Sequence, residues 1–139
     1  MLDMTPRPYL QFVFLCDDIV QHEDREIDVI HLVTHLLFMN DPPRMPPSPF
    51  SAKVVVGIGG GDRFSSYPLL VTMVGTDGSE SPLWDTAVGF TGEEYSPIKV
   101  QQFDFTFLEP GTYWFNVYLE GRPAGRYPVT VEYMPAGTS

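Results

Sequence analysis

The chain has 139 residues, 43% of them hydrophobic and 19% charged, which predicts a single globular domain over residues 1–139. Its 18 acidic and 8 basic side chains give a formal charge of −10, and this charge argues against nucleic acid or an anionic membrane as a partner. The single cysteine, Cys16, excludes an internal disulfide, and without a secretion signal or a run of about 20 apolar residues we expect a cytoplasmic protein.

Apolar side chains alternate with period two in short runs separated by Pro, Gly and Asp, which predicts an all-β fold: an immunoglobulin-like antiparallel β-sandwich of about eight strands. In residues 9–17, "YLQFVFLCD", apolar side chains occupy both odd and even positions, as in a strand that is covered on two faces. Residues 28–39, "DVIHLVTHLLFM", predict a strand more than a helix, because they are rich in β-branched residues and lack a polar helical face. The prolines of "NDPPRMPPSPF" then predict an extended crossover between sheets.

The middle of the chain predicts three more strands. Residues 50–58 alternate and run into the glycines of "GIGGGD", which we interpret as a turn. Residues 67–75 and 83–90 flank "TDGSESP" and predict a hairpin, with Asp77-Gly78 supplying the positive φ of its turn. In residues 98–107, Phe103, Phe105 and Phe107 occupy odd positions, whereas Ile98 and Val100 occupy even ones. A bulge near residues 101–102 would bring both sets onto one face, so we predict a bulge there.

The stretch "LEPGTYWFNVYLEGRPAGRYPVTVEY", residues 108–133, predicts a final hairpin with "EGRPAG" as its loop. Tyr113 and Phe115 belong to the core parity, so Trp114 and Tyr118 should face outward. Outward Trp and Tyr are enriched in binding surfaces, although a neighbouring loop covering them is an equal alternative. The predicted binding surface consists of Trp114, Asn116, Tyr118, Glu120 and Arg126, with Trp84 and Tyr95 as possible additions.

Two motifs are distinctive: "LCDD" at the end of the first strand and the pattern "EPGTYxF" near the C-terminus. With these motifs the chain resembles an uncharacterised family of small bacterial β-sandwich proteins. The resemblance spans most of the chain and implies a cytoplasmic protein without an assigned activity. It transfers no catalytic residue, and the proline-rich crossover and the "GIGGGD" loop depart from the family pattern.

Metal binding is not predicted from the acidic segment at residues 17–28. The segment lacks the spacing of a dedicated calcium loop, and Asp17 and Asp18 are consecutive, so on a strand they point to opposite faces. His31 and His35 would share a helical face but lie about 13 Å apart on a strand, too far for one zinc ion. We interpret the acidic segment as a solvated hairpin connection, and the histidines as residues with satisfied hydrogen bonds on a half-buried face.

No cofactor or catalytic residue is predicted either. "GIGGGD" lacks the third glycine and the following helix of a dinucleotide loop. A nucleophile elbow is missing, and Cys16 lies in an apolar run that indicates a buried thiol.

The sequence therefore favours a noncatalytic adaptor or assembly module that binds a protein partner, or itself as a homo-oligomer, through a sheet face or edge. The alternative is a small-ligand or carbohydrate-binding module that uses Trp114 and Tyr118. A metal-dependent enzyme that uses the acidic segment at residues 17–28 is the third hypothesis.

Overall fold

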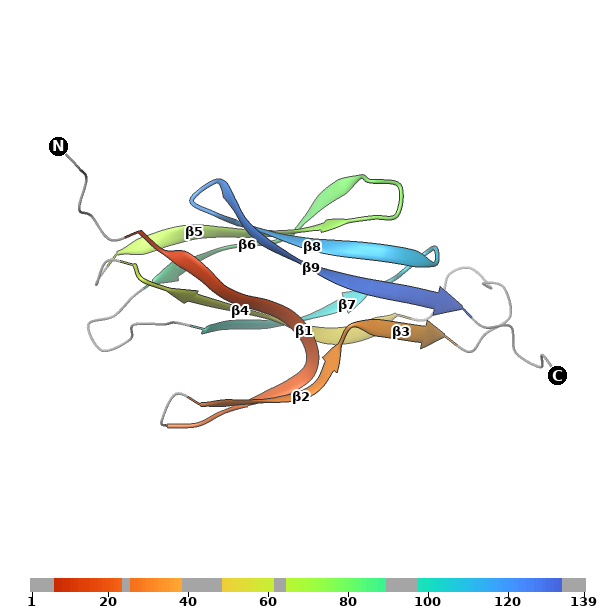
Figure 1. Ribbon diagram of the computed structural model, residues 1–139, viewed down its shortest axis with the longest axis horizontal. Coiled ribbons are helices and arrows are strands. Elements are labelled where there is room, and N and C mark those ends of the chain that lie inside the picture. Colours follow the sequence, from red (N-terminus) through yellow and green to blue (C-terminus); the bar gives the residue numbers. More distant parts are fainter. Residues whose placement is uncertain (1–6, 24–25, 39–48, 62–64, 90–97, 134–139) are drawn as a thin grey trace.

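Nine β-strands form two stacked sheets in the computed structural model (Figure 1), which describes residues 7–23, 26–38, 49–61, 65–89 and 98–133. The prediction of an all-β sandwich is confirmed. The strand count differs from the predicted eight because residues 28–39 were expected to form one strand and instead contribute to two. The proline-rich crossover and Tyr95 lie outside the described residues.

Each sheet combines strands that are distant in the sequence. The four-stranded sheet has the order β2 (Ile27–Val33), β1 (Tyr9–Gln21), β4 (Phe50–Gly59) and β7 (Ile98–Phe105). The five-stranded sheet has the order β3 (His35–Phe38), β9 (Arg122–Tyr133), β8 (Gly111–Leu119), β5 (Ser66–Val74) and β6 (Glu80–Gly89). Every pairing among the described strands is antiparallel except that of β3 with β9. The predicted hairpin of residues 67–75 and 83–90 is confirmed as β5 and β6.

Aromatic side chains fill much of the space between the sheets. Phe115 of β8 is fully buried and meets Phe105 of β7 edge to face at 5.5 Å between ring centroids. Phe107 makes a similar contact with Tyr113 at 4.8 Å. Trp84, a candidate for the outer surface, instead lies in this core, 5.8 Å from the ring of Phe103. The contacts of Phe115 with Phe105 and of Trp84 with Phe103 join β8 and β6 of one sheet to β7 of the other.

The "EPGTY" segment closes a backbone turn. The hydroxyl of Tyr113 donates to the carbonyl of Glu109 at 2.7 Å and accepts a hydrogen bond from the Glu109 amide at 3.2 Å. Gly111 between them has a φ of 140°, which non-glycine residues rarely adopt. A tyrosine hydroxyl bonded to the backbone a few residues upstream is the tyrosine corner of immunoglobulin-like sandwiches. The most distinctive motif of the sequence therefore has a structural role.

The chain changes sheets at Thr34, between β2 and β3. The amide of Thr130 in β9 donates to the carbonyl of Thr34 at 3.0 Å, and the hydroxyl of Tyr127 in β9 donates to the carbonyl of Val33 at 2.6 Å. Both bonds tie the end of β2 to the opposite sheet. The prediction of strand over helix for this segment is confirmed, but as two strands in two sheets.

Two local predictions, the turn at "GIGGGD" and the bulge near residues 101–102, differ from the structure. In both places glycine or apolar residues lie on the outer face of the four-stranded sheet. β4 extends through Gly59, one residue beyond the predicted strand 50–58, so the turn does not begin within "GIG". A Cβ at Gly57 would overlap the ring of Phe12. No register shift occurs between β4 and β7, so the predicted bulge is absent there. Val100 therefore lies opposite Val55 on the outer face, while Phe103 faces inward.

The final hairpin has a tighter turn than expected. Glu120 and Gly121 both have positive φ, 54° and 76°, and Leu119 pairs with Arg122, so two residues connect β8 to β9. The remainder of the predicted "EGRPAG" loop belongs to β9. Pro128 would predict that β9 is an edge strand, because proline lacks the amide that a second neighbour needs. Among the described strands β9 instead lies between β3 and β8, but β3 pairs with it only from Thr130 onward, so Pro128 lies before the covered segment.

β1 and β2 together extend beyond the sandwich. The pairing of β1 with β4 ends at Cys16, whereas its pairing with β2 continues to Gln21. Residues 17–23 and 26–32 thus form a two-stranded ribbon, here named the β1–β2 arm, which leaves the two sheets at the bottom of Figure 1. The described residues contain no helix that is long and apolar enough to cross a membrane.

Candidate binding surface on the five-stranded sheet

Outward side chains of β8 alternate with its core residues, as the sequence predicted. Tyr113, Phe115 and Val117 are buried, whereas Trp114 and Tyr118 are partly exposed on the opposite face. Trp114 lies opposite Val74 of β5, and Tyr118 lies opposite Leu70 of the same strand. The two predicted aromatic residues therefore share one face with side chains of β5.

Trp114 is covered on one side by a cation. The guanidinium carbon of Arg126 in β9 lies 4.3 Å from the centroid of the indole ring. The register places Arg126 opposite Asn116, one step along the face from Trp114. A cation this close to an indole face is attracted by the ring quadrupole. A sugar ring could stack on that side of Trp114 only after displacing the guanidinium.

Tyr118 belongs to a hydrogen-bond network centred on a carboxylate. The hydroxyl of Tyr118 donates to Oε2 of Glu80 at 2.6 Å, and the hydroxyl of Thr72 donates to the same oxygen at 2.5 Å. Thr72 is only 5% exposed, although Glu80 itself is exposed. The three residues come from β8, β6 and β5, so the network locks the position of Tyr118 on the sheet.

A hollow of about 320 Å³ lies beside this network. Leucine, proline and glycine contribute much of its lining, and two carboxylates contribute its charge. The lining residues are Pro68, Leu69, Leu70, Thr72, Glu80, Asp85, Tyr118 and Gly121. The hollow is therefore an apolar depression with acidic groups, next to the aromatic side chains.

The structure gathers four of the five predicted surface residues. Trp114, Asn116, Tyr118 and Arg126 lie on the outer face of β8 and β9. Glu120 lies apart, in the turn at one end of the sheet, where it lines a second hollow of about 290 Å³ together with Arg7 and Tyr9.

Sequence reasoning missed the residues that other strands bring to this face. Leu70 and Thr72 occupy outward positions of β5, and Glu80 begins β6, 38 residues before Tyr118. The outward parity of β5 was a usable signal for the first two residues. For Glu80 the sequence held no signal, because its position depends on the pairing of β5 with both β6 and β8.

The hydrogen bonds from Thr72 and Tyr118 lower the pKa of Glu80, and the same bond to Glu80 raises the pKa of Tyr118. Because the folded-state pKa of Glu80 is depressed, its carboxylate stabilises the native state above the unfolded-state pKa. This contribution is lost as pH falls through the folded-state pKa. We expect Glu80→Gln to be less stable than wild type near neutral pH, and the difference to shrink as pH falls below the unfolded-state pKa of Glu80, as measured by urea unfolding. Glu120→Gln in the exposed turn is the control, and an equal pH dependence in both variants would contradict the assignment.

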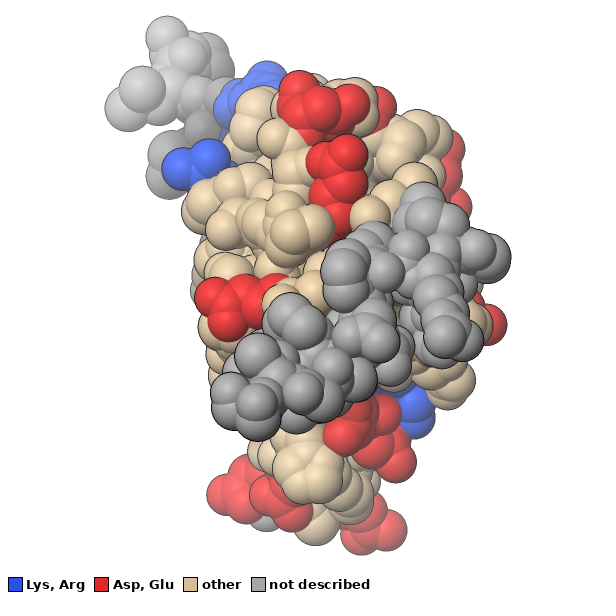
Figure 2. All heavy atoms as spheres, turned by 90° about the vertical axis from the view of Figure 1, so that its right-hand side faces the viewer, with Lys and Arg blue, Asp and Glu red and all other residues tan. Residues whose placement is uncertain are grey.

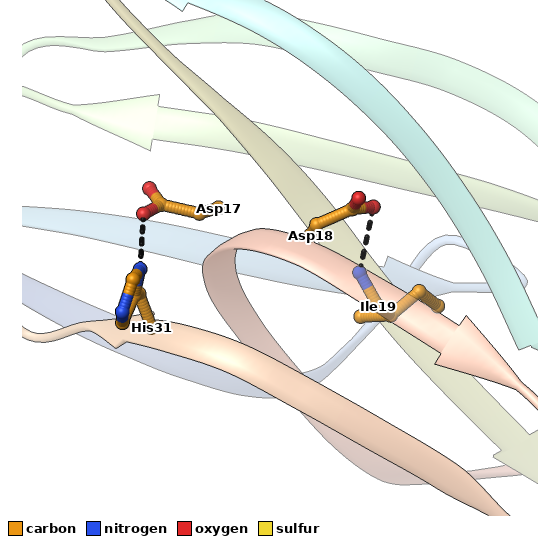
Figure 3. Close-up of polar contacts among 4 residues, drawn as sticks. All are labelled: Asp17, Asp18, Ile19 and His31. Carbon is orange, nitrogen blue, oxygen red and sulfur yellow. Dashed lines mark hydrogen bonds and ion pairs between the residues drawn. The ribbon is translucent and has the colours of Figure 1, made fainter.

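The acidic segment does not form a common site. Asp17 and Asp18 point to opposite faces of β1 (Figure 3), as expected for consecutive strand residues. Oδ2 of Asp17 lies 2.9 Å from Nδ1 of His31, whereas Oδ1 of Asp18 accepts hydrogen bonds from the Ile19 amide at 2.8 Å and from Nζ of Lys53 at 2.5 Å. Both interactions of Asp18 lower the pKa of its carboxyl group, with the Lys53 hydrogen bond as the main cause.

The three histidines each contact a different carboxylate. His22 lies 2.9 Å from Asp28, and His35 lies 3.2 Å from Glu132. His31 and His35 are in different sheets. In the described part of the chain, no three His, Cys, Asp or Glu side chains are arranged to hold a metal ion. Cys16 is fully buried, as predicted, and burial raises the pKa of its thiol.

The two stacked sheets and the tyrosine corner at Tyr113 are those of an immunoglobulin-like β-sandwich. A CARDB domain from Pyrococcus furiosus, whose structure is described as a complex with di-metal ions, superposes with a TM-score of 0.50 at 15% identity, covering 96% of this chain and 100% of that one. An immunoglobulin-like protein from Pseudomonas aeruginosa matches with a TM-score of 0.45 at 10% identity, over 93% of this chain and 99% of that one. At these identities the likeness shows the fold alone. The sequence matches no protein family model and no curated protein.

Proposed function

We propose that the protein is a noncatalytic module that binds a protein partner through the outer face of its five-stranded sheet. The observation that carries this proposal is the position of Trp114 and Tyr118 on one outward face, beside a hollow of about 320 Å³. Aromatic and arginine side chains next to a depression are typical of the residues that dominate binding energy at protein interfaces. Membership of the bacterial family that shares "LCDD" and "EPGTYxF", and a cytoplasmic location, belong to the same proposal.

The surface is already ordered before a partner arrives. Arg126 holds the Trp114 ring, and Glu80 holds the Tyr118 hydroxyl, so these side chains lose little freedom on binding. Asn116 and Arg126 would supply polar contacts around the aromatic rings.

The proposal is tested with a partner identified by affinity purification and then purified. The double variant Trp114→Ala, Tyr118→Ala should bind that partner at least about tenfold more weakly than wild type in isothermal titration calorimetry. Tyr9→Ala, which removes a 55% exposed tyrosine elsewhere, should bind like wild type. Circular dichroism must show both variants folded.

A double variant that is folded and binds the partner as tightly as wild type would refute the proposal for this face. Light scattering distinguishes binding of a partner from homo-oligomerisation, because self-association would raise the measured molar mass of the pure protein without any partner. Trp84→Phe leaves Trp114 as the single tryptophan. A change in its fluorescence on adding sugars alone would favour the carbohydrate-binding alternative, in which the ligand displaces Arg126 or occupies the hollow beside Tyr118.

A further inference from the structure

Large hydrophobic side chains are exposed mainly on the β1–β2 arm. In the described residues seven are exposed, and four of these lie on the arm: Val20, Val29, Ile30 and Leu32. Ile30 pairs with Asp18 and Val29 with Ile19, so apolar groups occur on both faces of the ribbon. A two-stranded ribbon is marginally stable in water without further packing. The arm therefore has the character of a surface that another chain completes.

The two edges of the arm differ in their backbone hydrogen bonds. On the β1 side the Ile19 amide donates to the Asp18 side chain (Figure 3), so a local group already uses this edge. The amide of His22 donates to the carbonyl of Glu26 across the ribbon at 2.9 Å. Hydrogen-bonded pairs alternate along an antiparallel ladder, so the backbone groups of Val29, like those of Ile19 opposite it, point away from the partner strand. The outer edge of β2 thus presents donors and acceptors for another strand.

The other outer strands carry features that discourage pairing. Lysine, proline, bulges and short covering strands are the usual protections of sheet edges. β6 contains Pro82 and a register shift against β5, β7 contains Lys99, and β3 is a four-residue strand that covers part of β9. β2, with the sequence "IDVIHLV", contains neither lysine nor proline. His31 has a positive φ, but it follows the segment from Ile27 to Ile30, so no positive φ interrupts that segment of the edge.

The negative charge of the arm favours a bound strand with basic side chains. Asp17, Asp18, Glu23 and Asp28 lie on it, and neither β1 nor β2 contains lysine or arginine. Figure 2 shows acidic side chains on both sides of an uncharged strip at the lower end of the molecule, where Figure 1 places the arm. A second copy would bring like charges together, whereas a basic segment would be attracted.

We propose that the outer edge of β2 binds an extended strand of another protein in which apolar residues alternate with lysine or arginine. Its backbone adds to the sheet beside Val29, and its apolar side chains cover Ile30 and Leu32. Its basic side chains then lie on the opposite face of the ribbon, the face of Asp17, where the negative charge of the arm attracts them. This site lies on the four-stranded sheet and does not depend on the function proposed for Trp114 and Tyr118.

The probe is a fluorescein-labelled peptide of alternating valine and lysine, measured by fluorescence anisotropy against the full chain. The matched probe has the same side chains but carries N-methyl groups on alternate amides, which prevents strand pairing and leaves the charge unchanged. We expect the unmethylated peptide to bind at least about tenfold more tightly. Leu32→Lys should reduce its affinity at least about tenfold, whereas Leu108→Lys, with the same change in charge at a site of similar exposure (52% against 54%), should reduce it less than about twofold.

A second variant, Val29→Pro, removes the amide that faces away from β1 and should also weaken binding at least about tenfold while circular dichroism stays unchanged. Equal binding of the two peptides, or equal losses in Leu32→Lys and Leu108→Lys, would show charge attraction alone and overturn the proposal. Absence of binding would overturn it too. A dimer in light scattering that Leu32→Lys abolishes would assign the edge to a second copy instead.

Discussion

Phe115→Ala is expected to lower the free energy of unfolding by about 3–5 kcal/mol, the largest effect of any substitution considered for this chain. Phe115 is fully buried and packs edge to face against Phe105 of the opposite sheet, so alanine would leave a cavity between the sheets. The loss is a large fraction of the 5–15 kcal/mol by which native domains are typically stable. Urea unfolding followed by circular dichroism measures it.

The control for this prediction is Leu108→Ala, which shortens a side chain that is 52% exposed. A surface truncation of this kind should change the free energy of unfolding by less than about 0.5 kcal/mol. If both variants unfolded at the same urea concentration, the core placed between the two sheets would be wrong.

Gly57→Ala is expected to destabilise the protein by about 1–3 kcal/mol, because the added methyl group overlaps the ring of Phe12 on the outer face of β4. Phe12 must then leave its contact with Phe14, whose ring centroid lies 5.5 Å away. The shift in the midpoint of thermal unfolding measures the effect.

Gly89→Ala at the end of β6 is the matched substitution. A Cβ at Gly89 meets no atom within 4 Å, so alanine should leave stability unchanged or raise it by about 0.4–1 kcal/mol through the unfolded state. Equal melting temperatures for the two variants would count against the close approach of Phe12 to β4.

Alternation along single strands was predictable where the strand is regular. In β8 the sequence correctly separated buried Tyr113 and Phe115 from outward Trp114 and Tyr118, because consecutive side chains of a strand point to opposite faces. Regularity fails in β6, where a register shift falls near Leu83. Trp84, a possible addition to the outer surface, lies opposite Val71 just beyond this shift and is part of the core.

Expectations about local irregularity were less reliable than expectations about strands. A bulge was predicted in β7 to bring Val100 onto the same face as Phe103, on the assumption that all apolar residues face one core. The four-stranded sheet is apolar on its outer face as well, with Phe12, Phe14 and Val55 there, so β7 needs no bulge. Gly59 lies outside the predicted strand 50–58 although it belongs to β4, because the aromatic ring that lies against it, that of Tyr9, comes from another strand.

The amino-acid sequence by itself determined the all-β character, the identity of most strands and the outward direction of Trp114 and Tyr118, since these follow from the covalent geometry of an extended chain. Only the tertiary structure decided which strands are neighbours. It brought Glu80 to Tyr118, separated His31 from His35 at Thr34, and left residues 17–21 of β1 without pairing to β4. Such choices depend on packing between segments distant in the chain, and that packing energy has no counterpart in local periodicity.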